Sequence, residues 1–370
     1  MSEHFSFSAP GRVEISGNHT DHQHGCVLAA AIDLETRADV VLNGTDRIRV
    51  FSEGFAPTDI SLDDFSVREE EKNTTAALVR GVAAAFAQRG AKIQGFDATI
   101  TASVPLGSGL SSSAAFEVLI GRIINTLFFD NKVSAVEIAR IGQYAENVYF
   151  GKPCGLMDQT ASSVGGLVFI DFADPAAPVV ERVSYDFASS GYTLCTVDSG
   201  ADHADLTDEY AAIPGELKVL CRKMGGEFLR DLDEKEFYSR LGELRAAAGD
   251  RAVLRAIHFY DENRRVLAQA EAIRNGDFET FLSYVNSSGQ SSWDYLQNVI
   301  PCGFTQHQDM AFAITLCKKL LGDNGAVRVH GGGFAGTCLV FVKNEALDGF
   351  AEGVEKVLGK GSCHVLHIRG

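Results

Sequence analysis

The segment Gly11–Asp21 reads G-R-V-E-I-S-G-N-H-T-D, and it gathers arginine, asparagine, histidine and aspartate side chains shortly before the apolar run Val27–Ile32. A core strand normally alternates apolar and polar residues or carries a continuous apolar run. The segment Gly11–Asp21 does neither. We therefore predict that its polar side chains bind a polar ligand.

Three histidines follow one another closely in H-T-D-H-Q-H, at positions 19, 22 and 24. Their spacing fits no standard zinc pattern, and no cysteine pair accompanies them. Hydrogen bonding to a polar ligand explains them better than a structural transition metal does.

Length and charge limit the classes of protein that this chain can represent. It has 370 residues, 45% of them hydrophobic, and a formal net charge of −16. Such a chain exceeds one typical domain, so we expect two, covering residues 1–190 and 191–370. The acidic balance argues against a general affinity for nucleic acid or for a membrane surface, because both partners need a basic face.

The eight cysteines are spread along the chain without a C-x-x-C pair. We expect reduced core thiols rather than disulfides. The first ten residues, M-S-E-H-F-S-F-S-A-P, lack the basic and apolar regions of a secretory signal, and no apolar run approaches the length of a membrane span. A cytoplasmic location is expected.

A glycine- and serine-rich segment, V-P-L-G-S-G-L-S-S-S-A-A-F-E-V-L-I-G, occupies residues 104–121 between a predicted strand (96–104) and a predicted helix (114–128). Glycines allow a phosphate to approach the backbone, and the amides at a helix amino terminus attract an anion. A serine hydroxyl there can also reach a magnesium ion. The segment fits neither standard phosphate motif, so a serine-capped helix after a turn remains an equal alternative.

Asp158 lies in G-K-P-C-G-L-M-D-Q-T-A-S-S-V-G-G, residues 151–166, which we expect to form a loop after a helix that begins near Ser134 and carries Glu146. A carboxylate among apolar neighbours can have its pKa tuned for general-base work. Local sequence alone nevertheless favours a helix-capping aspartate.

Two further patterns concern the fold. A hairpin is predicted around Asn43-Gly44, between strands 38–43 and 48–52. Late in the chain, V-R-V-H-G-G-G-F-A-G-T-C-L-V-F-V at residues 327–342 places glycines between two short strands, followed by a helix (344–358) and a last strand (363–368). This order fits a split β-α-β arrangement in the second domain.

Four of these segments together resemble a known family. The order G-R-V-x-x-x-G-x-H-T-D, P-L-G-S-G-L-S-S-S-A, C-G-L-M-D-Q and G-G-G-F-A-G is similar to that of the galactokinase branch of the GHMP small-molecule kinases. The resemblance spans residues 11–336. It implies an α+β, two-domain GHMP-kinase-like fold, with a mixed-sheet amino-terminal domain, a ferredoxin-like carboxy-terminal domain and the active site in the cleft between them.

The resemblance also implies the catalytic roles. Asp158 matches the aspartate that takes the proton from the anomeric hydroxyl, and Arg12 matches the arginine that keeps this aspartate ionised. Ser112 and Glu146 match the magnesium ligands. These roles agree with phosphoryl transfer, which depends mainly on positioning and charge neutralisation.

Sugar and nucleotide contacts are implied in the same way. The glycines at 107–109 and 331–333 are expected to line the nucleotide and sugar sites, while adenine contacts cannot be assigned from the motifs. The positions that match sugar contacts are Asn18, His19, Asp21, Gly155 and Tyr210. Those that match phosphate contacts are Gly107, Ser108, Gly109, Leu110, Ser111, Ser112 and Ser113.

The implied activity is ATP- and Mg²⁺-dependent phosphorylation of D-galactose to galactose 1-phosphate and ADP, with no obligate protein partner. Asn18 stands where the family usually has glutamate, and Glu14 where it usually has asparagine. Galacturonate, arabinose and N-acetylgalactosamine therefore remain alternative substrates. A non-catalytic regulator that senses galactose and ATP is the alternative class, but the presence of Arg12, Asp158 and Glu146 favours an enzyme.

Overall fold

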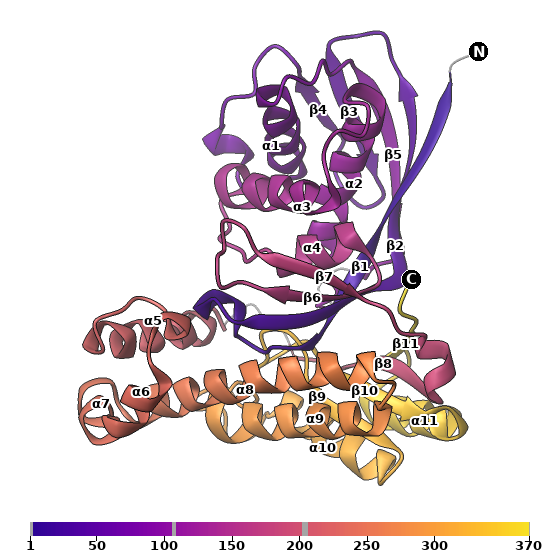
Figure 1. The fold of residues 1–370 in the computed structure, drawn as a ribbon. Helices are drawn as coiled ribbons and strands as arrows, with labels where there is room; N and C mark the ends of the chain where they lie inside the picture. The colour runs from indigo at the N-terminus through magenta and orange to yellow at the C-terminus, as the bar shows by residue number, and fades with distance from the viewer. Residues whose placement is uncertain (1–2, 106–108, 202–205, 370) are drawn as a thin grey trace.

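The computed structural model describes residues 3–105, 109–201 and 206–369. It contains two sheets, each covered by helices, and the longest helix, α8 (Asp250–Arg274), runs beneath the first sheet (Figure 1). This arrangement confirms the predicted α+β class. No helix in the described ranges is long and apolar enough to cross a membrane.

The first sheet is mixed, as predicted. Its strands follow the order β4-β3-β5-β2-β6-β7, and β1 pairs with β2. Only the β3–β5 pair is parallel. The strands are β1 (His4–Ser16), β2 (Cys26–Leu42), β3 (Arg47–Ser52), β4 (Thr58–Ser61), β5 (Phe96–Ala102), β6 (Leu167–Asp171) and β7 (Val179–Val183).

The predicted hairpin around Asn43-Gly44 is wrong, because β5 lies between β2 and β3 and pairs with both. The turn at Asn43-Gly44 forms hydrogen bonds to Gly95, the residue before β5. The Asn43 amide donates to the Gly95 carbonyl (3.1 Å), and the Gly95 amide donates to the Thr45 carbonyl (3.0 Å). A turn signal shows that the chain reverses, but it does not show which strand fills the place beside it.

Helices pack on one face of the first sheet around Val79, Phe86, Val118 and Ile123, all fully buried. The predicted loop at 151–166 is partly wrong, because eight of its residues form α4, and Asp158 lies in the first turn of this helix. The helical elements are α1 (Thr75–Gln88), α2 (Ser112–Phe128), α3 (Ala135–Tyr144), the π-helical turn Ala145–Phe150 and α4 (Met157–Val164).

The second sheet is antiparallel with the order β11-β8-β10-β9. Numbered along the chain, this order is 4-1-3-2, which is the arrangement of the predicted split β-α-β fold. Its elements are β8 (Tyr192–Asp198), α5 (Thr207–Lys223), α6 (Glu234–Ser239), α7 (Leu241–Ala248), α8 (Asp250–Arg274), α9 (Phe278–Ser291), α10 (Asp309–Leu321), β9 (Gly325–Val329), β10 (Thr337–Lys343), α11 (Leu347–Leu358) and β11 (Cys363–Leu366).

The two sheets share a core. One apolar cluster joins Val13 and Leu28 of the first sheet to Val266 of α8, Phe281 of α9 and Phe341 of β10. The long helices α8 and α9 therefore lie between the first sheet and the second, as Figure 1 shows. Such a core holds the segment Gly11–Asp21 against both halves of the molecule. The domain limits 1–190 and 191–370 stay a prediction.

Candidate active site

An arginine and a carboxylate pair where β1 meets α4. Arg12 Nε lies 2.6 Å from Asp158 Oδ1, and Arg12 Nη2 lies 2.7 Å from Asp158 Oδ2. The same guanidinium donates through Nη1 to the Gly109 carbonyl (2.5 Å), and the Arg12 amide donates to the Leu110 carbonyl (3.1 Å). Arg12 thus connects the glycine- and serine-rich segment with Asp158.

This pairing determines the charge of Asp158. Burial alone would raise the pKa of its carboxyl group, but the charge and hydrogen bonds of Arg12, with a hydrogen bond from the Ser111 hydroxyl, hold that pKa below its usual value. A bidentate arginine–carboxylate pair is short, strong and geometrically fixed. Asp158 is therefore ionised at neutral pH and can accept a proton or a hydrogen bond.

Beside this pair lies a cavity of about 410 Å³. Three of the residues predicted to bind sugar, His19, Asp21 and Gly155, line it together with Arg12. The full lining is Arg12, Glu14, His19, Asp21, His22, His24, Gln143, Gly155, Leu156, Met157, Phe172, Pro175, Gly331 and Gly332.

Position 155 requires a glycine, because the Asp21 carboxylate lies directly against it. A β-carbon on Gly155 would come within 2.5 Å of Asp21 Oδ2. Asp21 is half-buried, and the desolvation of its carboxyl group, together with the nearby charge of Glu14, raises the pKa of that group to about 6. Two segments far apart in the sequence thus form one wall of the cavity.

Two histidines of the cavity, His19 and His22, are neutral. Burial lowers the pKa of His22 to about 3 and also lowers that of His19. His19 Nε2 donates to the Gly332 carbonyl (3.0 Å), so its Nδ1 accepts from His22 Nε2 (3.2 Å). His19 thereby holds the glycine loop, residues 331–333, against the segment Gly11–Asp21. Among the described residues, no three His, Cys, Asp or Glu side chains form a group that could hold a metal ion.

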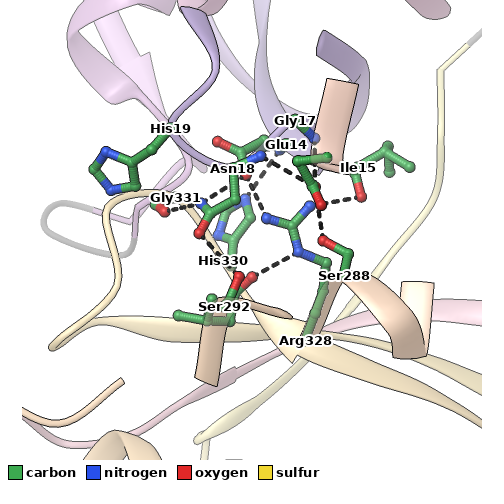
Figure 2. Close-up of polar contacts among 12 residues, drawn as sticks. Glu14, Ile15, Gly17, Asn18, His19, Ser288, Ser292, Arg328, His330 and Gly331 are labelled. Atoms are coloured by element: carbon green, nitrogen blue, oxygen red, sulfur yellow. Dashed lines mark hydrogen bonds and ion pairs between the residues drawn. The ribbon is translucent and has the colours of Figure 1, made fainter. Parts of the chain in front are cut away.

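Asn18 and Tyr210 do not line this cavity. The Asn18 side chain is 0% exposed and bonds only to protein groups, as Figure 2 shows. The Tyr210 hydroxyl donates to the Gly333 carbonyl (2.8 Å), and the Tyr210 ring fills the space where Gly332 lacks a β-carbon. Tyr210 therefore supports the glycine loop. Sugar contacts by these two residues stay predictions.

A second cavity, of about 1,030 Å³, lies at the start of α2 and is lined by Ser112 and Ser113. Gly107 and Ser108, predicted to bind phosphate, lie outside the described residues. Gly109 and Leu110 contact Arg12, and Ser111 bonds to Asp158 instead. The glycine- and serine-rich segment therefore lines the larger cavity and contacts Arg12, which lines the smaller one.

The far wall of the larger cavity could not be found from motifs. It is built from segments 52–59 and 70–78 and from three aromatic side chains, Phe55, Phe116 and Phe150. Aromatic and apolar walls with a few polar groups are typical of cavities that bind a flat organic ligand. Apart from Phe116, which follows the glycine- and serine-rich motif, none of these residues lies in a recognisable motif, so only their burial pattern in a fold could have identified them.

Glu146, one predicted magnesium ligand, lies in the π-helical turn and is buried. Gln159 Nε2 donates both to Glu146 Oε2 (2.9 Å) and to Glu117 Oε2 (3.0 Å), so the two carboxylates are neighbours. Burial and the charge of Glu146 raise the pKa of Glu117 well above its usual value. Glu117 Oε1 is buried without a hydrogen-bond partner among the described residues. Paired carboxylates with a free oxygen suit a hard cation such as Mg²⁺.

Comparison with known proteins places this geometry in a class. Residues 77–166 match the model for the GHMP kinases N terminal domain, and residues 1–40 match the galactokinase galactose-binding signature. The structure is similar to Methanococcus jannaschii mevalonate kinase, with a TM-score of 0.69 at 13% identity over 100% of this chain and 99% of that one, which shows a shared fold. The fold and the site define a GHMP-type small-molecule kinase.

More similar proteins narrow the class. A galactokinase of Glaesserella parasuis is 32% identical over 97% of this chain and 93% of its own, and one of Haemophilus influenzae is 32% identical over 95% and 89%. The crystal structure of Lactococcus lactis galactokinase complexed with galactose has a TM-score of 0.82 at 26% identity, covering 100% of this chain and 94% of that one. The chain belongs to the galactokinase family, whose members are sugar kinases.

Proposed function

We propose that this kinase transfers the γ-phosphoryl group of ATP to the anomeric hydroxyl of D-galactose, with Mg²⁺ as the required ion, in the cytoplasm. The observation that carries the proposal is the bidentate pair of Arg12 and Asp158 at the edge of the smaller cavity. A cavity lined by Arg12 supplies room for a sugar, and the larger cavity at the start of α2 supplies room for a nucleotide. The galactose bound in the Lactococcus lactis galactokinase supports the choice of sugar.

The proposed reaction places each group as follows. Ionised Asp158 accepts the proton of the anomeric hydroxyl, and the sugar oxygen forms a bond to the γ-phosphorus as the bond to the β,γ-bridging oxygen breaks and ADP leaves. Arg12 orients Asp158 and keeps it charged. Because its pKa is low, Asp158 is a weak base, so we expect proton transfer late in a loose transition state, with orientation as its main contribution.

Mg²⁺ supplies neutralisation of the phosphate charge when it is bound. Ser112 at the start of α2 and Glu146 beside Glu117 are the groups that would hold it. Backbone amides at the amino terminus of α2 attract the phosphates independently of the ion. The remaining chemistry rests on positioning by Arg12 and Asp158.

A coupled assay of ADP release tests the proposal over a panel of D-galactose, L-arabinose, N-acetylgalactosamine and galacturonate, with Mg²⁺ added or chelated. We expect turnover with galactose that needs Mg²⁺. The choice of sugar fails if galactose gives none and another sugar does. Binding of galactose and ATP without any ADP release would contradict the catalytic proposal itself.

A further inference from the structure

Asn18 has no polar atom left for a ligand. Its Nδ2 donates to Glu14 Oε1 (3.0 Å) and to the Gly331 carbonyl (2.5 Å), and its Oδ1 accepts from Asn298 Nδ2 (2.8 Å). Figure 2 shows the Asn18 amide beside Glu14 and Gly331. With the side chain fully buried and each polar atom satisfied, Asn18 holds the glycine loop.

Glu14 has the opposite environment. Arg12 and Glu14 are two residues apart on β1 without a bulge between them, so both point to the cavity, while Val13 and Ile15 point into the core. Arg328 Nη2 fixes Glu14 Oε1 at 2.5 Å. Glu14 Oε2 has no hydrogen-bond partner within the described ranges. This oxygen is not fully buried. The free oxygen therefore faces the cavity.

The surroundings hold this carboxylate rigidly and keep the cavity negative. Arg328 is fully buried and also donates to the Ile15 and Val329 carbonyls (2.9 Å each), so it cannot turn toward a ligand. The Glu14 amide donates to His330 Nε2 (3.1 Å). Around the cavity, Glu14 adds its charge to that of Asp21, while Arg12, the one arginine among the described lining residues, is already paired.

Resting on the proposed function, we propose that Glu14, and not Asn18, is the specificity-determining carboxylate of the sugar site. Glu14 Oε2 accepts a hydrogen bond from a sugar hydroxyl other than the reacting one, and its charge selects neutral sugars over uronic acids. The exchange of side chains between positions 14 and 18 thus keeps a carboxylate at the sugar and moves the amide into the protein.

The test compares kcat and KM for D-galactose and galacturonate in the wild type, in Glu14→Gln and in Glu35→Gln. Glu35 is the matched control, because it is also a buried, arginine-paired glutamate but lies outside the cavity. In Glu14→Gln we expect KM for galactose to rise about tenfold or more with kcat nearly unchanged, which is the signature of a lost ground-state contact to a charged acceptor. The preference for galactose over galacturonate should narrow. Glu35→Gln should leave KM and the preference unchanged.

Two further comparisons keep the proposal falsifiable. The wild type alone should use galactose with a kcat/KM at least about a hundredfold above that for galacturonate, because like charges in a buried site repel; a preference for galacturonate overturns the proposal. An unchanged KM and unchanged preference in Glu14→Gln overturn it as well. Absence of wild-type turnover with galactose would instead overturn the proposed function. If Glu14→Gln does not fold, Glu14→Asp, which keeps the charge and withdraws the oxygen, should raise KM, and an unchanged KM contradicts the role.

Discussion

Arg12 and Asp158 meet through two hydrogen bonds, and each depends on the other for its role in the reaction. The Asp158→Asn variant keeps the shape but removes the charge. We expect kcat for galactose to fall by about 10²- to 10⁴-fold, the usual range for a lost acid–base group. Steady-state kinetics measure this loss, and calorimetric titration with galactose shows whether sugar binding survives.

Ser111→Ala is the graded companion to this variant, because it removes only the hydroxyl that bonds to Asp158. Its kcat should fall much less than that of Asp158→Asn. Near-full activity of Asp158→Asn would exclude Asp158 as the base.

A substitution at Gly155 tests whether the cavity wall formed by Gly155 and Asp21 binds the sugar. In Gly155→Ala the new methyl group would come within 2.5 Å of Asp21 Oδ2 and displace that carboxylate. We expect KM for galactose to rise with little change in the unfolding temperature. The control is Gly215→Ala in α5, where a β-carbon meets no atom within 4 Å and alanine favours the helix. Equal KM values in both variants would show that Asp21 does not bind sugar.

Asp21 predicts a pH dependence. Burial and Glu14 raise its pKa to about 6, with Asp158 adding a smaller charge effect and the His22 amide opposing it. Only the ionised form accepts hydrogen bonds at both oxygens, so kcat/KM for galactose should rise as the pH increases through about 6. In the Glu14→Gln variant, this rise of kcat/KM should occur at lower pH, because the neighbouring negative charge is removed. If kcat/KM rises at the same pH in the variant as in the wild type, Glu14 does not affect the pKa of Asp21.

At the scale of elements, α8 fixes the turn that follows β1. Glu262 Oε1 accepts from the Gly17 amide (3.0 Å) and the Ser288 hydroxyl (2.7 Å), while Oε2 pairs with Arg265 (2.8 Å). Burial alone would raise the pKa of Glu262, but Arg265 and the other neighbours lower it to about 2. The stability from this carboxylate is therefore present above about pH 4.5 and is lost as the pH falls toward 2.

The Glu262→Gln variant should lose about 3–5 kcal/mol of unfolding free energy, because it leaves Arg265 without its partner inside the protein. Urea titration measures this loss. Asp261→Asn, one position earlier on α8, removes a pair with Arg264 that is partly exposed, and its cost should stay near 0–1 kcal/mol. Equal losses in the two variants would mean that α8 does not hold the turn.

Several elements were predictable because their signals are local. The helix that begins near Ser134, and the late sequence of two strands, a helix and a last strand, follow from capping, periodicity and glycine positions. The hairpin at Asn43-Gly44 was not predictable, because its neighbour β5 lies far along the chain. The helix α4 was missed because glycines and a proline flank it.

Contacts between residues far apart in the sequence also limited the prediction of the site. Arg12, Asp21 and Asp158 were predicted as site residues through the family resemblance of their segments, because local sequence alone favoured a capping role for Asp158. Which of Glu14 and Asn18 faces the sugar depends on Arg328, more than 300 positions away along the chain, and no local pattern contains it. The aromatic wall of the larger cavity is built from segments without motifs.

At the scale of the whole molecule, two halves share an apolar core, the segment Gly11–Asp21 lines a sugar-sized cavity, and a nucleotide-sized cavity lies at the start of α2. Asp158 borders this arrangement from α4, and the glycine loop closes it from the second sheet through His19 and Asn18. This arrangement carries one central claim, namely transfer of phosphate to the anomeric oxygen of galactose.

The most direct test is the position of phosphate in the product, determined by ³¹P and ¹H nuclear magnetic resonance after incubation with ATP, Mg²⁺ and D-galactose. We expect galactose 1-phosphate in an amount equal to the ADP formed. Methyl α-D-galactopyranoside, whose anomeric oxygen is blocked, should remain unphosphorylated. Phosphate on any other oxygen of galactose, or phosphorylation of the methyl galactoside, would contradict the proposed chemistry.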